Sequence, residues 1–170
     1  MGFALQAART TASRGNTTHL IHTSPWPSRL LAVGGGAMTD WAHDLLLGQD
    51  GNFYGTTRFG GAHNLGTVFK ITPAGVLTTL HSFDGTDGSE PRPGVVQGKN
   101  GSFYGTTCGF NPPWTSYSIT SSGKFKTLNS TNNVMNAACS FGPLLVGNDG
   151  NLYGTNTAGG QLEQGTVFRM

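Results

Sequence analysis

The chain has 170 residues, of which 11% are charged and 27 are glycines. This length suits one domain with a real core, and the composition favours short strands joined by tight turns over helices. The formal net charge is +2, but from Asp40 onward the chain has seven basic and eight acidic residues. The sequence therefore lacks the cluster of lysine and arginine that is typical of a nucleic-acid-binding protein. No apolar run reaches the roughly eighteen residues of a membrane span.

Residues 1–43 do not share the pattern of the rest, and we expect them to form an irregular, disordered leader. The apolar patch Phe3–Ala8 has no positive charge before it and is too short for a secretory signal, although an acid-free stretch with arginine and serine is weakly similar to a transit peptide. Met38 is a plausible start just before the repeats. Within the leader, Leu30–Val33 has the composition of one short strand, followed by a glycine hinge.

Three similar segments organise the chain. Asp50–Thr57 returns as Asn100–Thr107 and as Asp149–Asn156, and the three tyrosines Tyr54, Tyr104 and Tyr153 stand 50 and 49 residues apart. A fixed period of about 20–50 residues is typical of stacked supersecondary units. The sequence therefore predicts a repeat architecture.

Turn residues divide the first unit into four strands, which we expect over 44–48, 52–58, 66–72 and 76–83. Residues 52–58 are rich in aromatic and β-branched residues, and residues 66–72 alternate with period two. The dipeptide Asp50-Gly51 predicts a type I′ hairpin, and Pro73-Ala-Gly75 predicts the turn before the last strand.

The second and third units repeat this division. We expect strands over 94–97, 102–107, 114–120 and 124–129, and then over 143–146, 151–157 and 165–169. The third unit ends without a fourth strand.

These units predict an all-β fold, a partial β-propeller of about three four-stranded antiparallel blades with the last one incomplete. We place the β-repeat domain at 44–170, with blades at about 44–87, 88–137 and 138–170. Propellers usually have about four to eight blades, which leaves three alternatives: an open arc, a self-associating chain, or a fragment of a longer repeat protein. A strand such as Leu30–Val33, or one from a partner chain, could complete the last blade.

The first unit carries a resemblance to a known family. At Gly51–Thr57, Gly60-Gly61, Gly66–Gly75 and Leu80–Phe83 the chain resembles the GloVer tandem-repeat (choice-of-anchor) family of bacterial proteins. The second unit departs from the pattern at Trp114. The resemblance implies β-propeller-like repeats and an extracellular or cell-surface location, and it implies no particular activity.

Few residues have the spacing of a metal site. His19 and His22 stand three apart without an accompanying carboxylate, and His63 and His81 have no counterparts in the other repeats. The loop Asp84–Glu90 has three acidic residues, which suits calcium, but it lacks the alternation of an EF-hand. A solvated turn between blades is the alternative that we favour.

The repeated polar residues are explained by turn chemistry and packing. Asp50 and Asp149 bond their own backbone in turns, and Asn100 can do the same. The tyrosines suggest carbohydrate stacking, but their recurrence within strands favours packing. Cys108 and Cys139 are too few for a disulfide scaffold or a zinc site, and we interpret Cys108 as a buried or idle thiol.

Function is predicted only as a class. We predict no catalytic, cofactor-binding or metal-binding residues, and no cofactor, because Gly-x-Ser-x-Gly and phosphate-binding motifs are absent. The favoured hypothesis is a non-catalytic β-repeat module with a surface for protein or glycan binding. We expect no nucleic-acid partner, and the incomplete blade allows self-association. The alternative is a fragment of a propeller-type hydrolase or lyase, with Asn111, Trp114 or the 84–90 loop marking its site.

Overall fold

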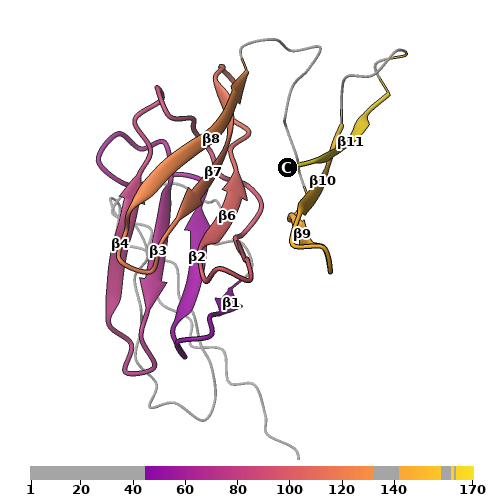
Figure 1. Ribbon diagram of the computed structural model, residues 1–170. Coiled ribbons are helices and arrows are strands. Elements are labelled where there is room, and N and C mark those ends of the chain that lie inside the picture. The colour runs from indigo at the N-terminus through magenta and orange to yellow at the C-terminus, as the bar shows by residue number, and fades with distance from the viewer. Residues whose placement is uncertain (1–44, 132–141, 158–161, 163) are drawn as a thin grey trace, which may run out of the picture.

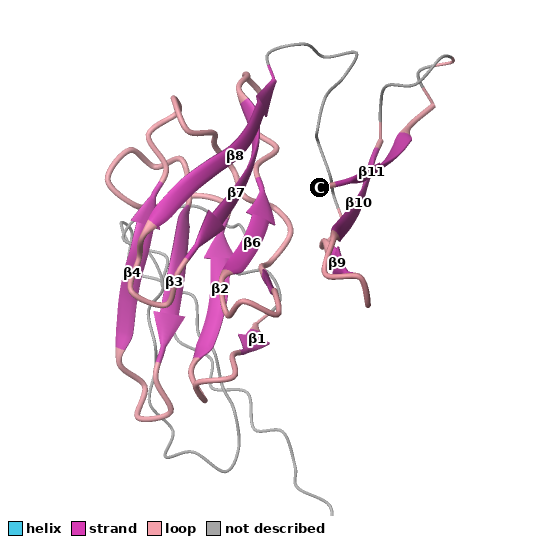
Figure 2. Ribbon diagram, viewed as in Figure 1, coloured by secondary structure: helices cyan, strands magenta, loops and turns pink. Residues whose placement is uncertain are grey.

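The computed structural model describes residues 45–131, 142–157, 162 and 164–170 of the chain. It contains three antiparallel sheets, and this described part has no helix (Figures 1 and 2). The all-β partial propeller predicted from the sequence is confirmed in its four-, four- and three-stranded sheets. The leader, with Leu30–Val33, His19 and His22, lies outside the described residues, and the domain boundaries stay a prediction.

Each sheet is a meander whose strands follow one another in chain order. The first blade contains β1 (Leu46–Leu47), β2 (Phe53–Thr57), β3 (Thr67–Ile71) and β4 (Leu77–Ser82). The second contains β5 (Val96–Gln97), β6 (Phe103–Thr106), β7 (Trp114–Ile119) and β8 (Phe125–Thr131). The third contains β9 (Leu145–Val146), β10 (Leu152–Asn156) and β11 (Thr166–Arg169). Each expected strand is present, although most are a residue or two shorter than predicted.

The turn between β1 and β2 differs from the prediction. A type I′ turn needs positive φ at both central residues, but the positive-φ positions include Gly51, at 78°, and not Asp50. Gly51 N donates to Gly48 O at 3.0 Å, which closes a turn over Gly48–Gly51. The turn is therefore of type I, with Gly51 in the left-handed region as its last residue. Asp50 keeps a negative φ, as a central residue of a type I turn does.

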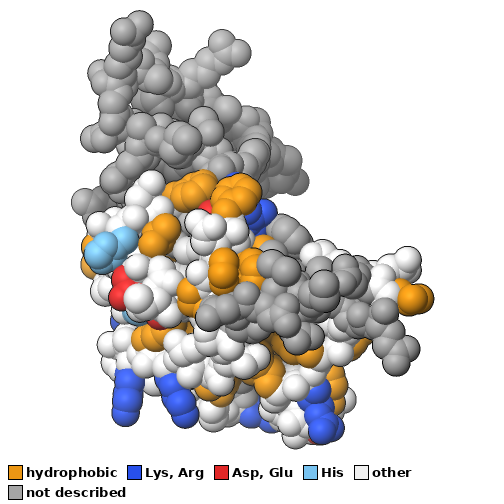
Figure 3. All heavy atoms as spheres, turned by 90° about the horizontal axis from the view of Figure 1, so that it is seen from above, with side chains coloured by type: hydrophobic (Ala, Val, Ile, Leu, Met, Phe, Trp, Pro, Cys, Tyr) orange, Lys and Arg blue, Asp and Glu red, His pale blue; other side chains and the backbone are white. Residues whose placement is uncertain are grey.

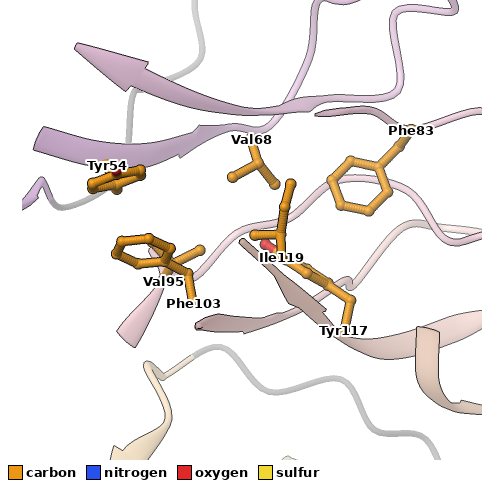
Figure 4. Packing of buried hydrophobic residues seen from close by; sticks show 7 residues of the cluster. All are labelled: Tyr54, Val68, Phe83, Val95, Phe103, Tyr117 and Ile119. Carbon is orange, nitrogen blue, oxygen red and sulfur yellow. The ribbon is translucent and has the colours of Figure 1, made fainter. Parts of the chain in front are cut away.

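The core lies between the first two blades. Tyr54, Val68 and Phe83 of the first blade meet the second blade's residues in one buried cluster, completed by Val95, Phe103, Tyr117 and Ile119 (Figure 4). Tyr54 and Val68 come from one face of the first sheet, since side chains alternate along a strand. The first blade thus receives the second on the face that carries Tyr54 and Val68, and the second blade packs there through Phe103, Tyr117 and Ile119.

An aromatic ring covers a glycine in the middle of every sheet. A Cβ on Gly55 would lie 2.7 Å from Cζ of Phe69, and the same clash would occur between Gly105 and Tyr117 and between Gly154 and Phe168. These pairs are direct cross-strand partners in their sheets. The glycine of each Tyr-Gly-Thr motif is therefore required by close packing inside the blade.

Consecutive blades are also joined at their first strands. The backbone N–H of Gln49 donates to Gln97 Oε1 at 2.9 Å, and one repeat later Lys99 Nζ donates to Asn148 O. Strands β5 and β9 are in contact. The two-residue strands β1, β5 and β9 thus form the edges at which the blades approach one another, as the inner strands of a propeller do.

Candidate functional site

The turn before each second strand holds the repeated tyrosine. Tyr54 OH donates to Asp50 Oδ2 at 2.6 Å and Tyr153 OH donates to Asp149 Oδ2 at 2.7 Å. In the second repeat the direction reverses, because Asn100 Nδ2 donates to the hydroxyl oxygen at 2.8 Å. The predicted turn role is confirmed in all three repeats, since each side chain also accepts a backbone N–H two residues on.

These bonds set the protonation of the repeated acids. The Tyr54 hydroxyl holds the pKa of Asp50 below its usual value, and the Tyr153 hydroxyl, with Asn151, lowers the pKa of Asp149 to about 2. Burial and the neighbouring carboxylate raise the pKa of the Tyr54 hydroxyl. Charged carboxylates that serve as turn acceptors have no proton to give near neutral pH, which agrees with a structural role.

The receiving face of the third blade is open. Tyr54 and Val68 on the first blade are both 0% exposed, whereas Val167, at the position of Val68, is 77% exposed and Tyr153 is half-buried. Arg169 is also exposed on this face. In the first blade the second blade covers the equivalent face. Among the described residues no blade covers this face of the third blade, and we call Tyr153, Val167 and Arg169 the open face.

The same blade has an open edge. Strand β3 of the first sheet pairs with β2 and β4, whereas β11 pairs with β10 alone within the part of the chain that the structure describes. An edge strand of this kind has backbone groups that can pair with another strand. The sequence prediction of an incomplete third blade is therefore confirmed for the described strands.

A second cluster of polar and aromatic residues lies where the first two blades meet. Glu90 Oε2 accepts from Arg58 Nε at 2.8 Å and from Arg92 Nη2 at 3.2 Å. The guanidinium carbons of Arg58 and Arg92 lie 5.8 and 5.7 Å from the ring centre of Phe110, which is 78% exposed. We call Arg58, Glu90, Arg92 and Phe110 the Arg–Phe cluster.

The three carboxylates of the loop Asp84–Glu90 have different partners. Asp84 Oδ1 accepts the backbone N–H and the hydroxyl of Thr86, and these bonds lower the pKa of Asp84. Asp87 bonds His81, and Glu90 is buried in its arginine pairs. The solvated-turn interpretation fits the exposed Asp84 but is wrong for Glu90, because two guanidinium groups compensate the buried charge. Among the described residues, no group of three or more potential ligands could hold a metal ion.

His81 and Asp87 form a pair of potential acid–base groups. His81 Nε2 and Asp87 Oδ2 are 2.6 Å apart. The imidazole stacks on Phe125 of the second blade with ring centres 3.7 Å apart, and its edge meets Phe83. The stacking on Phe125 joins this pair to the second blade. Within the described chain no serine or cysteine forms a hydrogen bond with the imidazole. His63 is exposed in the loop after β2.

Cys108 differs from the prediction of a buried thiol. It is buried, with 2% exposure, and it is disulfide-bonded. The chain's other cysteine, Cys139, lies outside the described residues. The sequence did not reveal a disulfide at Cys108, because a chain with two cysteines has no local signature of pairing.

Sequence reasoning located some of these residues but not their partners. Trp114 and Asn111 were noted as breaks in the repeat, and Trp114 Nε1 donates to Gly109 O at 2.8 Å beside the exposed Asn111. Arg58, Arg92 and Phe110 were missed. A comparison of the repeats could have found Arg58, because the second repeat has Cys108 at that position.

Basic side chains form no continuous surface. On the face seen in Figure 3, lysine and arginine gather in small separate groups among polar and hydrophobic atoms. The described residues contain no helix long and apolar enough to cross a membrane.

Comparison with known proteins gives a family and distant structural likenesses. A sequence model described as the Gloeobacter/Verrucomicrobia repeat matches residues 13–170. No curated protein matches the chain. An X-ray structure described as that of a candidate gluconolactonase is similar over 74% of this chain and 46% of that chain, with 16% identity and a TM-score of 0.48. The chain thus spans less than half the length of that protein, and so distant a likeness carries no argument about activity.

Proposed function

This chain belongs to the Gloeobacter/Verrucomicrobia repeat family, and from that premise we propose that it is a non-catalytic β-repeat module that presents surfaces for protein or glycan binding. One observation carries the protein-binding part. Val167 is 77% exposed at the position where Val68 is fully buried by the next blade. The repeat itself therefore indicates which kind of surface covers this position, namely another β-blade.

The open face has the chemistry of a receiving surface. Tyr153 has the same hydrogen-bonded turn that holds Tyr54. In the first blade, the ring of Tyr54 stacks on Phe103 of the second blade. Burial of one valine side chain stabilises by about 1.5–3 kcal/mol, so a blade that covers the open face gains from several such groups. A second copy of the chain is the partner that we propose.

The test is the molar mass of the folded full-length chain. We expect light scattering to show mass rising with concentration over the range of about 1 µM to 1 mM that weak association covers. Val167→Asp should abolish the rise, because an unpaired carboxylate is costly at an apolar contact. Leu162→Asp is the matched control, because Leu162 is 79% exposed in the same blade but lies in a loop. A constant monomer mass, or equal loss in both variants, contradicts the proposal.

A location outside the cytoplasm is part of this proposal. Cys108 is disulfide-bonded, and disulfides persist mainly in oxidising compartments. The redox state of Cys108 in the native host, measured by thiol labelling of cell fractions, tests it. A labelled, reduced thiol in the cytoplasmic fraction contradicts it.

The hydrolase or lyase alternative would use the pair of His81 and Asp87. Phe125 covers one face of this imidazole, and acid–base catalysis needs a group within hydrogen-bond reach of the substrate. We therefore keep the binding module as the proposed function.

A further inference from the structure

The second repeat has an asparagine where the other two have an aspartate. Asn100 stands at the position of Asp50 and Asp149, and each of the three residues is followed by a glycine. Asn100-Gly101 is the only Asn-Gly pair in the sequence. An asparagine before glycine loses its side-chain amide most easily, because the glycine has no side chain that hinders the approach of its nitrogen to Cγ.

The three turns have the same backbone shape. The glycine that ends each turn has a φ of 78° at Gly51, 78° at Gly101 and 83° at Gly150. In each turn the N–H of this glycine donates to the carbonyl oxygen three residues before it, at 2.9 to 3.0 Å. A carboxylate at position 100 would therefore enter a turn that holds a carboxylate in the two other repeats.

Two groups of the second turn lie against the side-chain amide of Asn100. The backbone N–H of Ser102 donates to Oδ1 at 3.1 Å, and Nδ2 lies 2.8 Å from the hydroxyl oxygen of Tyr104. A backbone N–H at this oxygen stabilises the negative charge that develops there when a nucleophile attacks Cγ. A hydroxyl beside Nδ2 is placed to give its proton to the nitrogen as it leaves.

From this geometry we infer that Asn100 is a self-modification site, at which the folded turn converts the amide to a carboxylate. Gly101 N attacks Cγ of Asn100 and loses its proton to solvent. The bond between Cγ and Nδ2 breaks, and the nitrogen leaves as ammonia with a proton from Tyr104, which solvent returns to the hydroxyl. Water then opens the cyclic imide at Cγ and restores the N–H of Gly101. One water is consumed and one ammonia released, with no oxidation or reduction.

Two hydrogen bonds of Gly101 oppose the attack and make it slow. Its N–H donates to Gly98 O at 2.9 Å, and its carbonyl accepts from Gln97 Nε2 at 3.0 Å. The turn must therefore open locally, which an exposed turn does far more easily than the whole domain unfolds. The bonds of the Asn100 side chain to Ser102 and Tyr104 do not use this N–H, so they persist while it is released.

The product has a defined place in the fold. In the first repeat the tyrosine hydroxyl donates to Asp50 Oδ2 at 2.6 Å, and in the third it donates to Asp149 Oδ2 at 2.7 Å. After conversion of Asn100 the Tyr104 hydroxyl becomes the donor, as in these two turns. Hydrogen bonds to a carboxylate are shorter and stronger than those between neutral groups. Conversion thus makes the three turns alike, and this inference goes beyond the proposed function without depending on it.

Peptide mapping by mass spectrometry tests the inference on the folded full-length chain. The chain is incubated at mildly alkaline pH in water enriched in the heavy oxygen isotope. We expect an acid with one heavy oxygen at position 100, and none at Asn52 or Asn151, which lie in the equivalent turns before large side chains. An unchanged amide at Asn100, or equal conversion at the three positions, overturns the inference.

A single hydroxyl separates assistance by the turn from the reactivity of the dipeptide alone. Tyr104→Phe keeps the ring and should slow conversion of the folded chain by at least about tenfold, since a positioned acid contributes that much or more. Tyr54→Phe makes the same change in the first repeat and should leave the rate at Asn100 unchanged. In urea the parent and Tyr104→Phe should convert equally. Equal rates in the folded chains, or a difference that persists in urea, contradict the inference.

The variant Asn100→Asp tests whether the turn accepts the product. Its urea midpoint should be no lower than that of the parent chain, because the carboxylate gains the Tyr104 hydroxyl as a donor. A lower midpoint would show that the second turn rejects a carboxylate, and it would overturn the inferred role of this position.

Discussion

Tyr54 of the first blade stacks on Phe103 of the second, with ring centres 3.8 Å apart and ring planes inclined by 26°. Both side chains are fully buried, and both come from the same repeated motif at neighbouring positions. The tyrosine of one copy thus packs on the residue before the tyrosine of the next copy.

Removal of this contact should be costly. Phe103→Ala is expected to lower the free energy of unfolding by about 3–5 kcal/mol, because it removes a buried ring and leaves a cavity. Phe103→Leu, which introduces the residue found at Leu152 of the third repeat, should cost less. Urea unfolding followed by circular dichroism measures both values. Equal stability of the parent and the alanine variant would mean that the blades do not pack in this way in solution.

Stability should depend on pH through the repeated turn. The pKa values of Asp50 and Asp149 are lowered from 3.8 in the folded state, to about 2 for Asp149, mainly by the tyrosine hydroxyls. A lowered folded pKa gives stability that is present above the unfolded value of about 4 and is lost as the pH falls through the folded value. Tyr54→Phe and Tyr153→Phe together should therefore reduce the decline in urea midpoint between pH 5 and 2. An identical decline in parent and variant would contradict this role.

The repeated glycine should not accept a methyl group. In Gly55→Ala the new Cβ would lie 2.7 Å from Cζ of Phe69, so we expect a loss of about 1–3 kcal/mol from overpacking. Shortening the partner in the double variant Gly55→Ala with Phe69→Leu should recover part of the loss. A double-mutant cycle of thermal or urea unfolding measures the coupling. Additive effects of the two changes would show that the ring does not cover the glycine.

Reduction should destabilise the folded chain. Cys108 is disulfide-bonded, and loss of a native disulfide typically costs about 2–5 kcal/mol. The urea midpoint of the parent chain should fall when dithiothreitol is added, whereas that of Cys108→Ser should be low and unaffected by the reductant. A parent midpoint that does not respond to reduction would contradict a stabilising bond.

Much of the fold was predictable because its signals are local. Turn residues, with period-two alternation at 66–72, placed each of the eleven described strands within a few residues. The spacing of Tyr54, Tyr104 and Tyr153 predicted three equivalent sheets. The turn role of Asp50 also followed from the sequence, because an aspartate bonds backbone only two residues away. Its bond to the Tyr54 hydroxyl was not predicted, since it depends on how the strand leaves the turn.

The sequence by itself determined the repeat, the strand order within each blade and the three strands of the described part of the third blade. The tertiary structure alone decided which face of each sheet is covered, that Val68 is buried while Val167 is exposed, and that Arg58, Glu90, Arg92 and Phe110 meet at one end. The reason is physical. Alternation and turns act between residues a few positions apart, whereas contacts between blades join residues some thirty to fifty positions apart, which no local pattern records.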